Sequence, residues 1–228
     1  MEFSRFELLV GDNLEKIQNL SVLILGVGGV GGYAAESLAR CGVKNITLVD
    51  YDTIDITNIN RQIIALHSNI GEKKVEVLKN RIIDINPNCN VKILDIFYTQ
   101  ENKDVIFFDH LDYIFDCCDT ILSKELVIRE AVKRNIKIIS SMGAGYKLDP
   151  RLIKISKLKK TDYDKLAKIL RYKLKDRKEC MEIPVVYSTE VVDKTSDVIA
   201  SNSYIPSMFG LYMTSFLVRD ILENKDEI

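Results

Sequence analysis

Few residues of the kind that build metal clusters, disulfide frameworks or histidine-based catalytic triads are present in this sequence. Its five cysteines include no Cys-x-x-Cys pair, which argues against a zinc ribbon. Only two histidines occur, His67 and His110, and no third group beside either of them suggests a triad, so we assign neither of them a catalytic role. An odd number of cysteines without a signal peptide favours a reduced, cytoplasmic protein.

A large net charge and a membrane-spanning run are also lacking. The 32 Lys and Arg residues nearly balance the 33 Asp and Glu residues, so the net charge is −1 and no global field draws the chain to nucleic acid. The longest apolar stretch near the C-terminus, residues 208–218, is too short to cross a bilayer, and we expect no membrane partner. Any basic binding surface must therefore be local.

Apolar runs alternate regularly with helical patterns over residues 21–140. Such alternation is typical of an α/β fold with a Rossmann-like, doubly wound and mostly parallel sheet and flanking helices. We predict a single domain over residues 1–228, in which 1–20 form two short helices, 21–140 form the core and 141–228 form an elaboration. In the core, we expect strands at 21–26, 45–50, 90–95, 112–116 and 136–140 and helices at 29–41, 72–85 and 120–134. In the elaboration, we expect a strand near 151–158, a basic helix near 162–177, a strand near 184–188 and a closing helix over 206–223 with Pro206 in its first turn.

A glycine-rich turn, Gly26-Val27-Gly28-Gly29-Val30-Gly31-Gly32, separates the first apolar run from a helical pattern. Gly26, Gly28 and Gly31 fit the spacing G-x-G-x-x-G, which lets the backbone approach a phosphate and lets the helix pack close to the strand. The N-terminus of the helix then offers free N–H groups and a partial positive charge. By itself the turn is a weak signal for a nucleotide site.

Asp50 ends the next predicted strand and is followed by Asp52. A carboxylate about 20 residues beyond the turn can bind ribose hydroxyls. A nicotinamide dehydrogenase would account for the turn and for Asp50, but it leaves unexplained the segment Asn58-Ile59-Asn60-Arg61-Gln62 that follows. The two signals together point to ATP rather than to a nicotinamide cofactor, and to adenylation rather than redox chemistry.

Two cations and two carboxylates stand in the following connections. Arg61 and Lys74 could together neutralise a triphosphate and stabilise charge at its α-phosphorus, although Lys74 alone could be ordinary surface charge. Asp116 and Asp119 follow an apolar run at the carboxyl end of a strand, where open α/β sheets bind ligands. Mg²⁺ takes one or two carboxylates plus phosphate oxygens, whereas the alternative role for Asp119 is to cap the helix that begins near Thr120.

Residues 154–178 form a locally basic segment in a chain of almost no net charge. The segment holds eleven Lys and Arg residues against three Asp residues. Neutralisation of RNA phosphates is one interpretation of this pattern, and the solvated face of an amphipathic helix is the other. The sequence alone weighs the two about equally.

Taken in order, these motifs resemble the ubiquitin-activating-like adenylating superfamily, which includes the activators of the thiamine and molybdopterin sulfur carriers. The resemblance covers residues 3–222 and rests on Gly26–Gly31, Asp50-x-Asp52, Asn58-x-x-Arg61-Gln62, Gly71-x-x-Lys74 and Asp116-x-x-Asp119. It implies ATP and Mg²⁺ as cofactors. It also implies nucleotide-binding roles for Gly26, Gly28, Gly29, Gly31, Asp50, Asp52, Asn58, Arg61, Gln62 and Lys74.

The same resemblance implies catalytic roles for Arg61 and Lys74 and for two further residues. Asp119 would be the ligand of Mg²⁺. Arg5 lies where the family places an arginine that reaches into the active site of its dimer partner. The resemblance therefore implies a homodimer with shared active sites.

Within the superfamily the chain looks most like the tRNA threonylcarbamoyladenosine dehydratases, on the segments 85–89, 143–145, 187–190 and 203–207. Those enzymes use ATP to activate the threonyl carboxylate of the modified adenosine beside the anticodon. A neighbouring group of the same side chain then closes a ring, and water is lost overall. Ring closure needs no cysteine nucleophile, because the attacking group is already part of the substrate.

The resemblance leaves two other functions to be weighed. One is an adenylating activator of a ubiquitin-like sulfur carrier that ends in Gly-Gly, although the zinc cysteines of many such activators are missing here. The other is a nucleotide-binding module without catalysis, against which the joint presence of Arg61, Lys74 and Asp119 argues. We expect tRNA to contact residues 154–178, while docking of a sulfur-transfer protein stays open.

Overall fold

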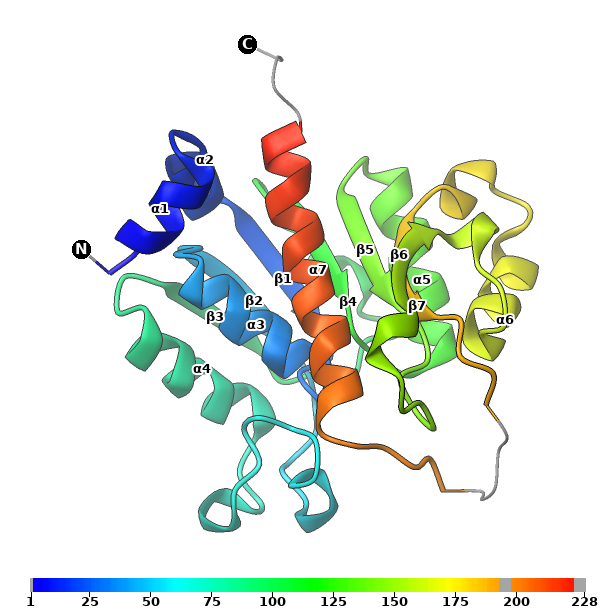
Figure 1. The fold of residues 1–228 in the computed structure, drawn as a ribbon, viewed down its shortest axis with the longest axis horizontal. Coiled ribbons are helices and arrows are strands. Elements are labelled where there is room, and N and C mark those ends of the chain that lie inside the picture. Colours follow the sequence, from blue (N-terminus) through cyan, green and yellow to red (C-terminus); the bar gives the residue numbers. More distant parts are fainter. Residues whose placement is uncertain (1, 193–197, 224–228) are drawn as a thin grey trace.

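The computed structural model describes residues 2–192 and 198–223, and its centre is a seven-stranded sheet (Figure 1). The strand order is β3-β2-β1-β4-β5-β7-β6, and β6 alone in this sheet runs antiparallel, through its pairing with β7. This architecture confirms the predicted Rossmann-like, mostly parallel fold. The strands are β1 (Ser21–Leu25), β2 (Asn45–Val49), β3 (Asn90–Leu94), β4 (Tyr113–Asp116), β5 (Lys137–Ser141), β6 (Ile153–Lys157) and β7 (Pro184–Ser188).

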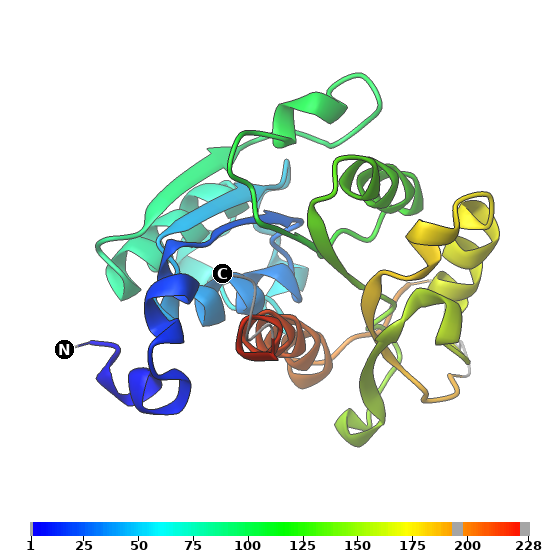
Figure 2. The same cartoon turned by 90° about the horizontal axis from the view of Figure 1, so that it is seen from above.

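Helices cover both faces of the sheet. In Figure 2, α3, α4 and α7 lie on one face and α5 lies on the other. The helix α6 packs beside α5, beyond the β6–β7 end of the sheet. The α-helices are α1 (Ser4–Val10), α2 (Asn13–Asn19), α3 (Gly31–Arg40), α4 (Lys74–Ile85), α5 (Ile121–Lys133), α6 (Lys165–Leu174) and α7 (Tyr204–Glu223).

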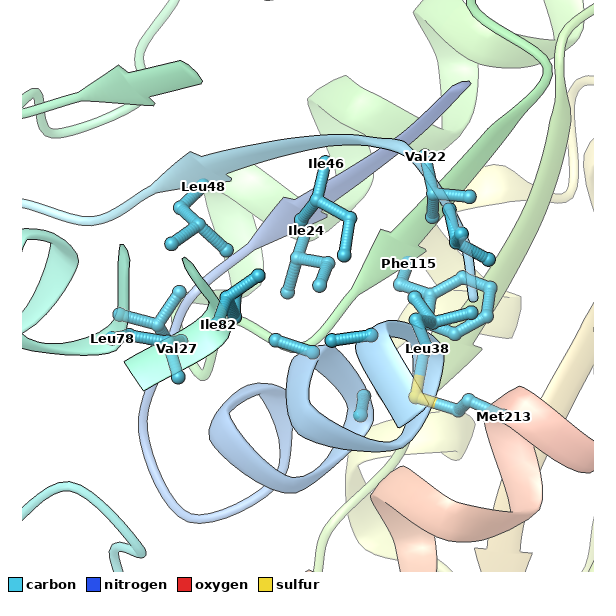
Figure 3. Packing of buried hydrophobic residues seen from close by; sticks show 14 of the residues in the cluster. Val22, Ile24, Val27, Leu38, Ile46, Leu48, Leu78, Ile82, Phe115 and Met213 are labelled. Atoms are coloured by element: carbon cyan, nitrogen blue, oxygen red, sulfur yellow. The ribbon is translucent and has the colours of Figure 1, made fainter. Parts of the chain in front are cut away.

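Strand β1 shows why the two layers form. Its apolar side chains alternate, so that Val22 and Ile24 join one hydrophobic core and Leu23 and Leu25 join the other. Figure 3 shows the first core, in which side chains from β1, β2 and β4 point towards α3 and share a cluster with Met213 of α7. A strand that is buried on both faces has a continuous apolar sequence, and this is the pattern from which β1 was predicted.

The predicted elements are present, but their ends differ where a cap or a turn takes over. The basic helix expected over 162–177 is shorter, because Asp164 caps α6 by accepting a hydrogen bond from the backbone N–H of Ala167 at 2.9 Å. The closing helix starts earlier than expected, at Tyr204, where Asn202 Oδ1 accepts the N–H of Ile205 at 2.9 Å. Pro206 lies in the first turn of α7, as predicted.

The parallel strands bring their carboxyl ends to the same edge of the sheet. The topological switch point lies between β1 and β4, since the chain runs outward from β1 in both directions. The glycine turn, Asp50 and the segment 117–119 follow β1, β2 and β4 directly, so this edge collects the predicted functional residues. Among residues 2–192 and 198–223, we find no helix with the length and hydrophobicity of a membrane span.

Candidate active site

A cavity of about 890 Å³ opens at this edge of the sheet. Its size is in the range of sites for small molecules and cofactors. Most of the residues predicted to bind a nucleotide or to act in catalysis line it together: Gly26, Gly28, Gly29, Asp50, Asp52, Asn58, Arg61, Gln62, Lys74 and Asp119. The structure does not place Gly31 or Arg5 on its wall.

The glycine turn is shaped by close backbone contacts. Gly26 has φ +88°, and a Cβ atom there would lie 2.9 Å from the backbone nitrogen of Cys118. Gly31 is buried beneath the turn at the start of α3, where a Cβ would collide with the carbonyl oxygen of Gly26. Gly31 thus allows the helix to pack against the strand, while Gly28 and Gly29 face the cavity.

Asp50 fixes the turn to the end of β2. Its Oδ2 accepts a hydrogen bond from the backbone N–H of Val27 at 2.7 Å, and its Oδ1 accepts one from the N–H of Asp52 at 2.9 Å. A carboxylate oxygen has two acceptor sites, so each oxygen retains one for a ligand hydroxyl. The position therefore suits the predicted ribose contact.

The two predicted cations are held differently. Lys74 is 5% exposed, and its Nζ lies 2.7 Å from Asp52 Oδ2, which orients a buried ammonium group at the cavity wall. Arg61 Nη1 donates to the carbonyl of Thr57 and to Asn60 Oδ1, both at 2.9 Å. Two positive groups from separate connections therefore face one cavity, as the sequence predicted.

The amides of Asn58 and Gln62 complete this side of the cavity. Asn58 is buried in a 3₁₀ helix (Ile56–Asn58), and its Oδ1 accepts the backbone N–H of Asp55 at 3.2 Å. Gln62 is 6% exposed, and its Oε1 has no hydrogen-bond partner within the described ranges. A buried amide oxygen without a partner is costly, which marks Gln62 as a side chain that a ligand or water would satisfy.

Asp116 and Asp119, three residues apart, have opposite environments. Asp116 is fully buried and accepts hydrogen bonds from Ser140 Oγ and, at 2.9 Å, from Nζ of the equally buried Lys124. Asp119 is exposed on the cavity wall and forms no hydrogen bond or ion pair with any residue that the structure describes. Thr120, rather than Asp119, is the N-cap residue of α5. One carboxylate therefore secures the strand end and the other is available to a ligand.

Negative charge collects at one rim of the cavity. The pKa of Tyr51 is raised, first by the neighbouring Asp52 carboxylate and further by burial and by Asp119 and Asp50. No cluster of three or more His, Cys, Asp or Glu side chains suited to a metal occurs in residues 2–192 and 198–223. A single carboxylate such as Asp119 fits Mg²⁺ when phosphate oxygens supply further ligands, because Mg²⁺ typically binds in that way.

The cysteines beside the cavity are poor nucleophiles. Burial, followed by the charge of Asp116, raises the pKa of the Cys117 and Cys118 thiols far above the ordinary value. Since the thiolate is the reactive form, both residues are expected to be inert. Cys180, which lies outside the cavity, is fully buried. These cysteines therefore act as small packing side chains rather than as nucleophiles.

Sequence reasoning missed an aromatic wall of the cavity. Tyr51 and Phe97 form an edge-to-face pair with ring centroids 4.8 Å apart, and both line the cavity together with Tyr98. The Tyr98 hydroxyl is buried and has no hydrogen-bond partner in the described part of the chain. The only sequence signal was two aromatic residues after predicted strands, which is too common a pattern to predict a site.

The basic segment 154–178 is not one uniform patch. Lys157 and Lys159 form ion pairs with Glu182, and Lys173 pairs with Glu125 at 2.9 Å. Lys165, at the start of α6, is exposed and lines the cavity. Part of the segment is therefore a solvated, ion-paired surface, and part lies beside the candidate active site.

Arg5 and the residues around it lie away from this cavity. Arg5 is exposed on α1, as are the apolar side chains of Leu8 and Leu9, which are 87% and 80% exposed. Within its own chain, Arg5 is not among the residues that line the cavity.

The fold and the site together define an α/β nucleotide-binding protein, with two cations and an unpaired carboxylate at the switch point of the sheet. The chain belongs to the ThiF family, whose model matches residues 3–220. This match confirms the resemblance to adenylating enzymes.

The relatives of the chain are more specific. A tRNA threonylcarbamoyladenosine dehydratase of Bacillus subtilis is 43% identical over 244 residues, which cover 98% of this chain and 95% of the relative. An enzyme of the same name from Escherichia coli is 37% identical over 186 residues, or 78% of this chain and 69% of the relative. The crystal structure of E. coli tRNA N6-threonylcarbamoyladenosine dehydratase, TcdA, in complex with ATP has a TM-score of 0.92 and 33% identity, with 97% of this chain and 94% of the other covered.

Proposed function

We propose that this protein is an ATP-dependent tRNA threonylcarbamoyladenosine dehydratase. The observation that carries the proposal is that Arg61, Lys74 and the free carboxylate of Asp119 meet the glycine turn in one cavity. The activity expected from the motifs is also the one named for relatives of nearly the same length. The reaction activates the threonyl carboxylate with ATP, closes a ring within the same side chain and removes one water overall.

The residues of the cavity bind and orient the reactants. The glycine turn and the N-terminus of α3 offer N–H groups and a partial positive charge to the phosphates of ATP. Asp50 holds the ribose, and Arg61 and Lys74 stabilise negative charge that develops on the phosphates during activation. Asp119 would hold Mg²⁺, which would neutralise further phosphate charge when bound.

The absence of a reactive thiol favours ring closure over transfer to a carrier. An intramolecular nucleophile is already positioned by the substrate and needs no covalent intermediate on the enzyme. The raised pKa of Cys117 and Cys118 and the burial of Cys180 fit this route. Activation of a sulfur carrier that ends in Gly-Gly is the alternative, because the same ATP site would serve it.

We further propose a homodimer of single-domain subunits in which Arg5 completes the partner's active site. The exposed apolar side chains of Leu8 and Leu9 beside Arg5 support an interface on α1, since large exposed apolar groups often mark contact surfaces. All seven strands, from β3 at one edge to β6 at the other, belong to one sheet, which supports a single domain. A cytoplasmic location agrees with the five free cysteines of the described structure.

Nucleoside mass spectrometry tests the proposed activity. The protein is incubated with ATP, Mg²⁺ and tRNA that carries threonylcarbamoyladenosine, and the nucleosides are analysed after digestion. We expect the loss of one water from the modified nucleoside, dependent on ATP and absent for tRNA without the modification. No mass change would refute the dehydratase, and pyrophosphate exchange triggered by a Gly-Gly carrier would then establish the alternative.

Subunit mixing tests the shared site. Arg5→Ala and Asp119→Ala should each be inactive, whereas a mixture should regain part of the activity, because one site of each heterodimer carries neither change. Subunit exchange is verified by mass spectrometry of the intact dimer. Exchange without any recovered activity would show that Arg5 does not act across the interface.

A further inference from the structure

The cavity continues beyond the residues assigned to ATP. Its far half is built by the loop after β5, by the first turns of α6 and by the segment before α7. No acidic side chain and a single cation, that of Lys165, line this half within the described residues. The residues that line it are Ser141, Met142, Gly143, Ala144, Gly145, Lys165, Leu166, Ile169, Ile199 and Ser201.

A buried ion pair fixes the position of this half. Asp164, which caps α6, lies 3.4 Å from Nζ of Lys147, and both side chains are at most 5% exposed. Lys147 Nζ also donates to the carbonyl of Ser188 at the end of β7, at 3.0 Å. The first turn of α6 is therefore held against the sheet and the loop after β5. A site built in this way is a preformed feature of the fold.

The segment before α7 is tied to both halves of the cavity. Its Ala200 carbonyl accepts the backbone N–H of Tyr146 at 2.9 Å, and its Ser201 carbonyl accepts Asn60 Nδ2 at 3.0 Å. Asn60 also accepts a hydrogen bond from Arg61, so the segment is linked to a residue of the ATP side. Ile199 of this segment lines the cavity and is 70% exposed.

The helix α6 presents two different stripes to its surroundings. Lys165 and Ile169, four residues apart and hence on one face, line the cavity. Lys168 and Tyr172 are exposed on the neighbouring stripe but do not line it. The cavity-facing stripe thus combines a cation with an apolar surface, because Ile169 is 40% exposed there.

We propose that the far half of the cavity binds the modified adenosine itself, swung out of the anticodon loop. The inference rests on the proposed function: a carboxylate that is to be activated must share a cavity with the phosphates of ATP. The flat base would pack against the apolar wall of Leu166, Ile169 and Ile199, and Lys165 would pair with a phosphate of the same RNA segment. Unstacked bases of RNA loops are commonly bound in this manner, by apolar or stacking contacts together with basic side chains.

Matched charge reversals on α6 test the role of Lys165. Lys165→Glu and Lys168→Glu change the net charge equally, and a Glu residue in the first turn of a helix is favourable for folding. We expect Lys165→Glu to raise the KM for tRNA and the Kd for a modified anticodon stem-loop by about tenfold or more, and Lys168→Glu to change them by less than about threefold. The KM for ATP should change little in either variant. Equal effects of the two variants would overturn the assignment of Lys165.

The apolar wall is tested with Ile169→Asp and the control Tyr172→Asp. Wild type should bind a stem-loop with the threonylcarbamoyl group more tightly than one without it, and Ile169→Asp should remove most of this preference while Tyr172→Asp and Ile169→Leu retain it. Fluorescence anisotropy measures all four proteins without requiring turnover. Equal wild-type affinity for the two stem-loops, or an unchanged preference in Ile169→Asp, would refute the inference. If wild type dehydrates the nucleoside while either result is found, the proposed function stands and only the location of the substrate is wrong.

Discussion

The two halves of the cavity are built in different ways. The ATP half consists of residues that follow β1, β2 and β4 directly, and its charges are arranged by short-range contacts such as that of Asp50 with Val27. The far half is assembled from segments that are far apart in the chain and is held by the pair of Lys147 and Asp164. The ATP half is consequently a polar, anion-binding surface, while the far half is an apolar wall with one cation.

This difference explains why the motifs of the ATP half are the more specific ones. A phosphate-binding turn constrains the residue type at every step, because glycine is needed where the backbone approaches Cys118 or the carbonyl of Gly26. An apolar wall accepts any side chain of suitable size. The far half can therefore tolerate changes of residue type that the glycine turn cannot.

The largest effect is expected in the ATP half, from Asp119→Ala. Loss of the carboxylate should reduce turnover by at least about 100-fold, because the variant could no longer hold the Mg²⁺ that would neutralise charge on the phosphates of ATP. The melting temperature should stay close to that of wild type, since Asp119 is exposed and forms no hydrogen bond or ion pair with the described residues. The control is Asp109→Ala at the opposite end of the sheet, which should leave turnover unchanged. Near-normal rates for Asp119→Ala would refute the proposed metal-binding role of Asp119.

A second change separates the stability of the site from its chemistry. Lys124→Met leaves the buried Asp116 carboxylate without its cation, and should lower the free energy of unfolding by about 3–5 kcal/mol. The double variant with Asp116→Asn should recover part of this loss. Urea denaturation measures both. A loss below about 1 kcal/mol would contradict the assigned role of the pair.

The pH dependence of this pair has a defined sign. Burial is the largest influence and opposes the charge of Lys124, but Asp116, Cys118 and Cys117 together outweigh it, so the pKa of Lys124 is raised. The contribution of Lys124 to stability is therefore complete below the pKa of the unfolded side chain, about 10.4, and is lost only as pH rises through the higher folded value. The difference in unfolding free energy between wild type and the double variant Lys124→Met/Asp116→Asn, which has no titrating group at either position, should stay constant from about pH 7 to pH 9 and shrink as pH rises above about 10.

A smaller effect is expected at the link between the two halves. Asn60→Asp keeps an acceptor for Arg61 but loses the donor to the Ser201 carbonyl. The KM for tRNA should rise by about three- to tenfold, which corresponds to the loss of one hydrogen bond, and the KM for ATP should rise less. Asn88→Asp introduces the same charge on an exposed turn and serves as control. An equal rise of both KM values would contradict a specific role of Asn60 in linking the ATP half to the far half.

The smallest effect is expected from the cysteines. In Cys118→Ser, the serine hydroxyl can donate a hydrogen bond to Asp116, as the thiol of Cys118 does at 3.0 Å. Turnover should therefore change by less than about twofold. Burial raises the pKa of Cys41 to about 11, so this thiol should also resist alkylation at pH 8. Mass spectrometry after iodoacetamide treatment measures the labelling. A tenfold loss of turnover in Cys118→Ser would contradict this prediction and favour a mechanism in which a cysteine thiol takes part.

The sequence predicted the elements of the fold more reliably than their ends. Helical patterns do not show where a cap such as Asp164 will terminate the repeat, since that depends on the geometry of the preceding loop. In the site, the motifs predicted ten residues that do line one cavity, but the aromatic wall of Tyr51 and Phe97 was not predicted, and Lys165 was predicted only as one of the eleven cations of segment 154–178, not as part of the cavity. Their roles come from segments that only folding brings together.

By itself, the sequence determined the alternation that gives a parallel sheet, the glycine turn, and the gathering of Asp50, Arg61, Lys74 and Asp119 at one edge. These follow because parallel strands place their carboxyl ends side by side, so that residues just after each strand must meet. Only the tertiary structure decided which of two nearby aspartates is available. Asp116 is not available to a ligand, because α5 and β5 bring Lys124 and Ser140 to its carboxylate, whereas Asp119 faces the cavity.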